Sequence, residues 1–243
     1  MPTGIEFRES DPGIGLLTRT PKPGPELDMV KREAPGLVGM FMRSGQEAAV
    51  FWEPKVDVGF PYLVLAIFYP GVYNSWTNAR STITTTDMKI VHQLFSSRGM
   101  SSAGLEKRLG FTSRELLRSF ERLLDAGLVR RSNSQWRLMP FSDVFGIQRL
   151  IAIEAKLNNW TEAFMQAESN TWFASESYVL SPVTQPKVKT QDKSSAHHVG
   201  ILTSGKGMLQ KVVSSSRNRL PASYGSWQFN EWIGRELNRK VRR

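Results

Sequence analysis

A strand–helix–strand pattern restricts the fold of this chain more than any other feature. The first strand is predicted at LIAIEAKL (residues 150–157), the helix at NWTEAFMQAESNTWFAS (159–175) and the second strand at SYVLS (177–181). This order favours two parallel strands joined by a right-handed crossover. We therefore expect an α/β fold.

Two further strands and a helix are predicted upstream of this pattern. EAAVFWEP (residues 47–54) and PYLVLAIFY (61–69) are apolar runs of strand length on either side of a turn-like segment. Apolar residues recur at roughly helical spacing in residues 25–45, although Pro35 predicts a break there. Residues 1–22 are rich in glycine and proline, and we expect them to be irregular.

The pattern changes to three short helices and a hairpin in the middle of the chain. Helices are predicted at residues 86–97, 100–110 and 112–127, and LVRRSNSQWRL (128–138) has the features of two short strands around a turn. LLDAGLVRR followed by QWRL resembles the end of bacterial winged helix-turn-helix domains. This resemblance covers about fifty residues.

The winged-helix resemblance implies that the third helix lies in the major groove of DNA. Winged helices also serve as packing and dimerisation modules, and acidic residues dilute the charge of the third helix, so this alternative stays open. The candidate nucleic-acid-binding residues on the third helix and hairpin are Arg114, Arg118, Arg122, Arg130, Arg131 and Arg137.

Positive charge is concentrated near the C-terminal end. The 243-residue chain has a net charge of +10 and a pI of about 10.0. Residues 185–243 hold twelve lysines and arginines but only three acids. This distribution favours a polyanionic partner, for which DNA is the expected one. We expect a loop at residues 182–198, where the C-terminal core passes into a basic C-terminal extension.

Several classes of protein are disfavoured by what the sequence lacks. There are no cysteines, which excludes disulfides, thiolate nucleophiles and cysteine-based zinc sites. No apolar run reaches the roughly 18 residues of a membrane span, so no membrane partner is expected. The N-terminal residues lack the pattern of a signal peptide, and a cytoplasmic location is expected.

Glu154 and Lys156 are two charged residues within the apolar strand of the opening pattern. Alternation places both side chains on the same face of that strand. A carboxylate can bind a hard divalent cation, and a lysine beside it can orient water and stabilise charge that develops on a phosphate. The simpler alternative is a salt bridge on the face of a strand.

The surrounding sequence resembles the PD-(D/E)XK nuclease superfamily, which has the restriction-endonuclease-like fold. IEAK matches the motif strand, NWTEAFMQA the following helix, and Gln166 a glutamine that several subfamilies carry there. The resemblance implies a mixed sheet core and metal-dependent phosphodiester hydrolysis with Mg²⁺ or Mn²⁺. Its implied catalytic residues are Glu154, Lys156 and Gln166, with Glu154 as a metal ligand.

The family's second acid is missing from its expected position, where this chain has Tyr62. A tyrosine hydroxyl is normally protonated at neutral pH and is a poor ligand for Mg²⁺. Asp57, Asp143 or Glu53 is expected to supply the missing carboxylate, and Glu26 can join the site as in some family members. Otherwise the chain binds nucleic acid without cutting it.

The combined prediction is an α/β protein with a restriction-endonuclease-like mixed sheet core, an inserted winged helix and a basic C-terminal extension. Its expected function is DNA binding with metal-dependent hydrolysis; the alternative is an inactive DNA-binding, assembly or regulatory protein. A homodimer or multisubunit complex is conceivable; the tryptophans of the second half of the chain favour a multisubunit partner, and core packing is the alternative explanation for them. The predicted parts are the N-terminal core 1–80, the winged helix 81–140, the C-terminal core 141–184 and the extension 185–243.

Overall fold

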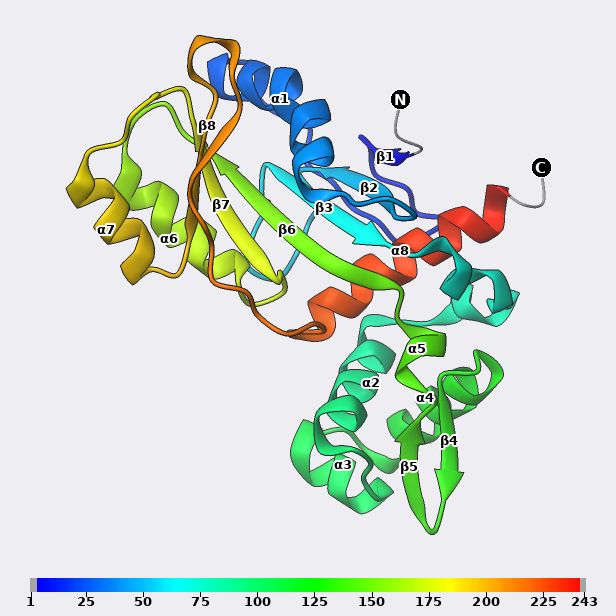
Figure 1. The fold of residues 1–243 in the computed structure, drawn as a ribbon. Coiled ribbons are helices and arrows are strands. Elements are labelled where there is room, and N and C mark those ends of the chain that lie inside the picture. The colour runs from blue at the N-terminus through cyan, green and yellow to red at the C-terminus, as the bar shows by residue number, and fades with distance from the viewer. Residues whose placement is uncertain (1–3, 241–243) are drawn as a thin grey trace. The chain divides into compact units, whose positions relative to one another are not determined.

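The computed structural model describes residues 4–240, which divide into two compact units (Figure 1). The units contain the following described residues: 4–69 with 147–225 in the first, and 70–146 with 226–240 in the second. The second unit therefore contains the predicted insertion, 81–140, together with additional residues on both sides of it. Among the described residues, no helix is long and apolar enough to cross a membrane.

The first unit is built on a mixed sheet of seven strands, in the order β1-β2-β3-β6-β7-β8-β9. Neighbouring strands are parallel in the pairs β1/β2, β6/β7 and β7/β8, and antiparallel in the other three pairs. This sheet confirms the predicted α/β class. The strands are β1 (Gly4–Phe7), β2 (Glu47–Trp52), β3 (Leu63–Phe68), β6 (Ile147–Ala155), β7 (Glu176–Ser181), β8 (Gly200–Thr203) and β9 (Gln210–Val213).

The predicted strand–helix–strand pattern is confirmed by β6, α6 (Trp160–Asn170) and β7. The two strands are parallel, and Glu154 pairs with Val179 in the register. Ile153 and Ala155 point into the same apolar cluster, so alternation directs Glu154 to the opposite face of the sheet. Because Asn170 of α6 binds Glu154, this is the face that α6 covers.

Helices pack on both faces of the sheet, as Figure 1 shows. The helix α1 (Pro25–Phe41) contributes Val30 and Leu37 to a cluster with β3, β6 and β7. On the other face, Phe164 of α6 packs with Val179 and Ile201. These two apolar clusters fix the sheet between its helices by burying side chains of alternating direction.

Three local predictions differ from the structure. The helix α1 continues through Pro35. Proline has no N–H group, so one backbone carbonyl of the helix loses its hydrogen-bond partner. Because Pro35 is exposed, water can reach that carbonyl. The predicted irregular segment 1–22 contains β1, which pairs with β2. The predicted loop 182–198 contains the helix α7 (Val188–Ala196), which ends just before β8.

The second unit contains three helices followed by a two-stranded hairpin, in the predicted order. Thr84 and Asp87 form a capping box at the start of α2, and Thr112 and Glu115 form another at the start of α4. These caps bind backbone N–H groups that have no partner within a helix. The elements are α2 (Thr85–Ser97), α3 (Ser102–Leu109), α4 (Ser113–Asp125), β4 (Val129–Ser132), β5 (Gln135–Leu138), α5 (Phe141–Val144) and the 3₁₀ helices η1 (Pro70–Ser75) and η2 (Asn78–Thr82).

Residues 185–243 are not a separate extension in the described structure. Strands β8 and β9, with the 3₁₀ turn η3 (Gly205–Gly207) between them, complete the seven-stranded sheet. Most of the last helix, α8 (Tyr224–Lys240), belongs to the second unit. There Glu231 of α8 binds the buried Arg80 at 2.7 Å. Arg242 and Arg243 lie outside the described residues.

Candidate functional site

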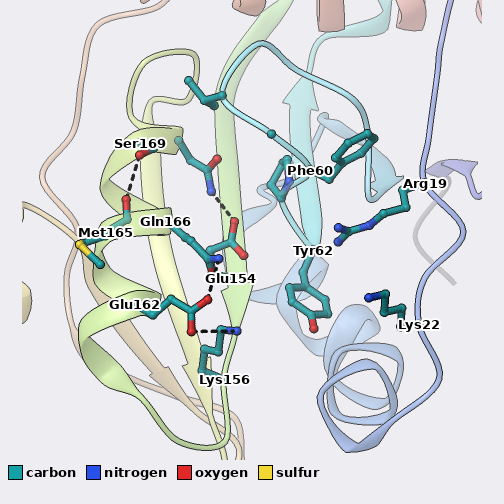
Figure 2. Close-up of a pocket in the computed structure, with 14 residues that line it drawn as sticks. Arg19, Lys22, Phe60, Tyr62, Glu154, Lys156, Glu162, Met165, Gln166 and Ser169 are labelled. Carbon is teal, nitrogen blue, oxygen red and sulfur yellow. Dashed lines mark hydrogen bonds and ion pairs between the residues drawn. The ribbon is translucent and has the colours of Figure 1, made fainter.

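A pocket of about 620 Å³ opens where β6 ends, between α6 and the segment that leads into β3 (Figure 2). The residues around it are mostly polar, and all of them belong to the first unit. The pocket is lined by Arg19, Lys22, Val58, Gly59, Phe60, Pro61, Tyr62, Glu154, Lys156, Glu162, Met165, Gln166, Ser169 and Asn170.

Glu154 is the most buried acid of this pocket, with 5% of its surface exposed. Its Oε1 accepts a hydrogen bond of 2.7 Å from Nδ2 of Asn170. Burial raises the pKa of Glu154 to about 7, and the charge of Glu53 adds to the rise, whereas Asn170, Lys156 and Arg19 oppose it. Near neutral pH the carboxyl group therefore exchanges between its protonated and charged forms.

Lys156 points into the same pocket as Glu154, as alternation along the strand predicts (Figure 2). Its Nζ lies 3.7 Å from Oε2 of Glu162 on α6. Glu162 is itself held by Asn159, at 3.0 Å, and by Gln166, at 3.3 Å. The lysine is thus ion-paired to the helix and not to Glu154, which differs from the simple salt bridge considered from the sequence.

Gln166 lines the pocket from the exposed side of α6. The position follows from the helix, because residues 162 and 166 are four apart and lie one above the other. The resemblance placed Gln166 at the site, and the structure brings it to the same pocket as Glu154 and Lys156.

Tyr62, at the position of the missing acid, is bonded to another acid. Its hydroxyl donates a hydrogen bond of 2.7 Å to Oε2 of Glu26, and Oε1 of Glu26 accepts one of 3.3 Å from the backbone N–H of Leu157. Burial, followed by the hydrogen bond and charge of Glu26, raises the pKa of Tyr62 well above its ordinary value. The hydroxyl therefore stays protonated at physiological pH.

Glu53 is close enough to the pocket to affect the pKa of Glu154, but its charge is already paired. It is 2% exposed and forms an ion pair with Arg19. The backbone N–H of Arg19 also donates to the carbonyl of Glu53 at 3.0 Å. This double contact fixes the segment before α1 against the end of β2, and it brings a cation to the edge of the pocket.

The other two candidate carboxylates do not line the pocket. Asp57 is exposed on the turn between β2 and β3. Asp143 is on α5 of the second unit and not on a core strand, because β6 begins only at Ile147. Among residues 4–240, no group of three or more histidine or acidic side chains is arranged to hold a metal ion.

Arg19, Lys22 and Phe60 are pocket residues that sequence reasoning missed. Arg19 and Lys22 lie in the segment expected to be irregular, and Arg19 places its guanidinium over the ring of Phe60 at 5.1 Å. No local pattern links residues so far apart in the chain to Glu154. Asn170 could have been found from the sequence, because it ends the helix that follows the motif strand.

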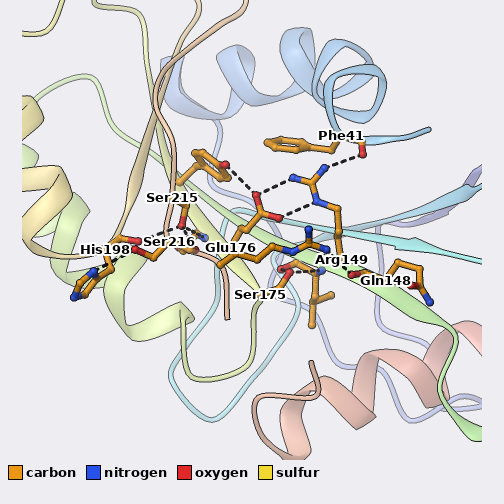
Figure 3. Close-up of polar contacts among 12 residues, drawn as sticks. Phe41, Gln148, Arg149, Ser175, Glu176, His198, Ser215 and Ser216 are labelled. Carbon is orange, nitrogen blue, oxygen red and sulfur yellow. Dashed lines mark hydrogen bonds and ion pairs between the residues drawn. The ribbon is translucent and has the colours of Figure 1, made fainter. Parts of the chain in front are cut away.

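The first unit also contains a fully paired charged cluster away from the pocket (Figure 3). Arg149 makes two hydrogen bonds of 2.8 Å to Glu176 and one of 3.0 Å to the carbonyl of Phe41. Tyr178 donates to the same carboxylate at 3.0 Å. Because each partner is satisfied within the fold, this cluster joins β6, β7 and the end of α1 and needs no ligand.

The predicted nucleic-acid-binding arginines in the second unit fall into two groups. Arg122 makes hydrogen bonds of 2.7 and 2.8 Å to the buried carboxylate of Asp87, so its guanidinium is bound within the unit. The other five are exposed: Arg114 and Arg118 on α4, and Arg130, Arg131 and Arg137 on the hairpin.

Comparison with known proteins does not identify a family for this chain. No family model, no curated protein and no solved structure matches this chain.

Proposed function

We propose that the protein is a DNA-binding, nuclease-like enzyme that hydrolyses phosphodiester bonds with Mg²⁺ or Mn²⁺. One observation carries this proposal. Glu154 and Lys156 project from one strand into a single pocket, where Arg19 and Lys22 provide two further cations. Metal-dependent phosphodiester hydrolysis requires an acid that can bind the metal cation, beside positively charged groups that can bind phosphate. Here Glu154 is the acid, and the positively charged groups are Lys156, Arg19 and Lys22.

The donor set supports a cation that keeps most of its water. Glu154 offers one buried carboxylate, and Mg²⁺ is often bound by one or two carboxylates together with water and substrate phosphate. Glu53 is the second candidate acid, but in this structure it pairs with Arg19. When bound, the cation supplies a water of lowered pKa and neutralises charge on the phosphate.

The chain's own groups have separate roles in this proposal. Lys156 stabilises the negative charge that develops on the phosphate and orients the attacking water. Gln166, through its hydrogen bond to Glu162, holds the partner of Lys156 in place. Arg19 and Lys22 bind the phosphates on the opposite side of the pocket.

We further propose that the second unit is a winged-helix module that binds DNA through its hairpin. The order of three helices and a two-stranded hairpin supports this assignment. Arg130, Arg131 and Arg137 are exposed on the hairpin and provide the phosphate contacts. We leave α4 out of this interface because Glu121 and Asp125 share its exposed surface and would repel phosphate.

A second candidate function is DNA binding without cleavage. Two observations favour it: Tyr62 occupies the position of an expected acid and binds Glu26, and Arg19 neutralises Glu53. Arg19 supplies positive charge at the pocket, but unlike a bound metal cation it does not activate water. In that case, Lys156 would contribute to DNA binding alone.

A cleavage assay distinguishes the two candidates. The full-length protein is incubated with plasmid, single-stranded DNA and RNA in Mg²⁺, in Mn²⁺ and in chelator. Cation-dependent cleavage is expected, with a rate about a hundredfold lower for Lys156→Ala because one stabilising charge is removed. Lys55→Ala, an exposed lysine outside the pocket, is the matched control. Equal cleavage by Lys156→Ala and the wild type would reject the enzyme proposal.

A further inference from the structure

The outward side of α4 carries apolar side chains that the second unit leaves largely uncovered. Leu117 is 61% exposed and Leu124 is 46% exposed. The two leucines are seven residues apart, which places them on one line along the helix two turns apart. The side chains that pack into the unit come from the opposite face: Leu116, Ser119, Phe120 and Leu123.

Charges of opposite sign border the two leucines in an ordered way. Arg114 and Arg118 lie in the N-terminal half of the helix, and Glu121 and Asp125 lie in the C-terminal half. All four side chains are exposed, and within residues 4–240 none of them forms an ion pair. The centre line of the outward face is therefore positive at its start and negative at its end, with the two leucines along one edge of it and Glu115 along the other.

We propose that this face binds α4 of a second copy of the chain in an antiparallel, two-fold symmetric pair. In this arrangement Arg114 lies opposite the partner's Asp125, and Arg118 lies opposite the partner's Glu121. Both ion pairs are centred on the same point of the helix. A single two-fold axis through that point therefore generates both pairs, and each pair occurs twice in the dimer. Leu117 and Leu124 of the two copies then pack against one another along one edge of the charged line.

The charge pattern selects this occupant over the alternatives. A parallel pair would bring like charges of the two helices together along their whole length, which is destabilising. A DNA backbone would meet Glu121 and Asp125, which repel phosphate. A second copy of α4 in the antiparallel orientation is the partner whose charges complement those of this face.

The expected association is weak and depends on concentration. A helix of 13 residues is about 20 Å long, so a pair of such helices buries less area than the roughly 800 Å² per partner of a standard interface. Sedimentation equilibrium of the full-length protein, between about 10 µM and 1 mM, is therefore the appropriate measurement.

Charge reversal tests both the surface and its orientation. Arg118→Glu and Glu121→Arg are each expected to weaken dimerisation about tenfold or more, because each places like charges opposite one another. The combined variant Arg118→Glu/Glu121→Arg restores the affinity to within about threefold of the wild type, because the pair is re-formed with its signs exchanged. Only an antiparallel pair joins position 118 of one copy to position 121 of the other.

Controls separate this proposal from general effects of charge and from the proposed enzyme activity. Arg130→Glu makes the same change on the hairpin of the same unit and should leave dimerisation unchanged. Leu117→Gln, which keeps every charge, should weaken it. Thermal unfolding confirms that each variant is folded, and no DNA or cation is needed. A monomer at every concentration, or a dimer indifferent to these changes, would overturn the proposal. Variants that dimerise like the wild type but lose affinity for DNA, measured separately by fluorescence anisotropy, would overturn the proposal and assign α4 to DNA.

Discussion

At the residue scale, Glu154 makes the stability of the protein dependent on pH. Burial raises its pKa from 4.5 to about 7. Between these values the folded protein holds a proton that the unfolded chain releases, so stability falls as the pH rises through this range. Glu154→Gln removes the buried charge and should raise the free energy of unfolding at pH 8 by up to about 3 kcal/mol.

Urea unfolding at several pH values measures this effect. The gain for Glu154→Gln should shrink as the pH falls through 7 and disappear about one pH unit below 4.5, where the wild-type carboxyl is protonated in both states. Glu162→Gln is the control, since this acid is partly exposed in the same pocket. A gain that does not change with pH would show that Glu154 does not titrate in this range.

Tyr62 is predicted to have a structural role through its hydroxyl. Tyr62→Phe removes the 2.7 Å hydrogen bond to Glu26 and should lower the free energy of unfolding by about 1 kcal/mol. Tyr69→Phe is a suitable control because Tyr69 is 45% exposed. Chemical denaturation of both variants provides the comparison. Equal stability of Tyr62→Phe and the wild type would show that the bond contributes little.

At the element scale, α2 and α4 are joined by the buried carboxylate of Asp87. This carboxylate caps α2 through Thr84 and binds the guanidinium of Arg122 on α4. Burial opposes its charge, but the hydrogen bonds from Arg122 and Thr84 outweigh burial and lower the pKa of Asp87. The guanidinium of Arg122 is therefore bound within the second unit and is not available for a contact with phosphate.

Asp87→Ala should destabilise the second unit by about 3 kcal/mol, since it removes a cap and leaves the cation of Arg122 without its partner. Glu115→Ala removes the corresponding acid from the exposed capping box of α4 and should have a clearly smaller effect. Thermal unfolding monitored by circular dichroism compares the two variants. A larger loss for Glu115→Ala would contradict this role of Asp87.

The elements that could be predicted are those whose signals are local. The alternation around Glu154 identified β6, and helical spacing identified α2 and α4. The path of α1 through Pro35 could not be predicted, because it depends on which side of the helix faces water. Arg19 was missed for the same kind of reason, because it reaches the pocket through a long-range pair with Glu53.

At the scale of the whole molecule, much of the positive charge near the C-terminus is used within the fold. Arg235 donates to the carbonyls of Arg80 and Ile83, and Arg239 pairs with Glu236. The concentration of charge along the sequence therefore overestimates what is available to DNA. The exposed arginines of the hairpin are the better candidates for binding phosphate.

DNA affinity should fall as salt concentration rises, with a slope that depends on the hairpin. Replacing Arg130, Arg131 and Arg137 together by alanine should reduce the slope of log affinity against log salt by about 0.9 for each phosphate that is no longer neutralised. Replacing Arg114 and Arg118 in the same way should change the slope less. Fluorescence anisotropy over a salt series measures both variants. Equal slopes for the hairpin variant and the wild type would exclude the hairpin from the interface.

The most direct test of the central claim measures cleavage and DNA affinity in the same samples. Single-turnover cleavage in Mn²⁺ is recorded for the wild type, Lys156→Ala and Glu154→Gln, beside their dissociation constants for the same DNA. If the pocket performs phosphodiester hydrolysis, both variants lose about a hundredfold or more in rate while their affinities stay within about threefold. A wild type that binds DNA without cutting it, or variants that cut at the wild-type rate, would contradict the account.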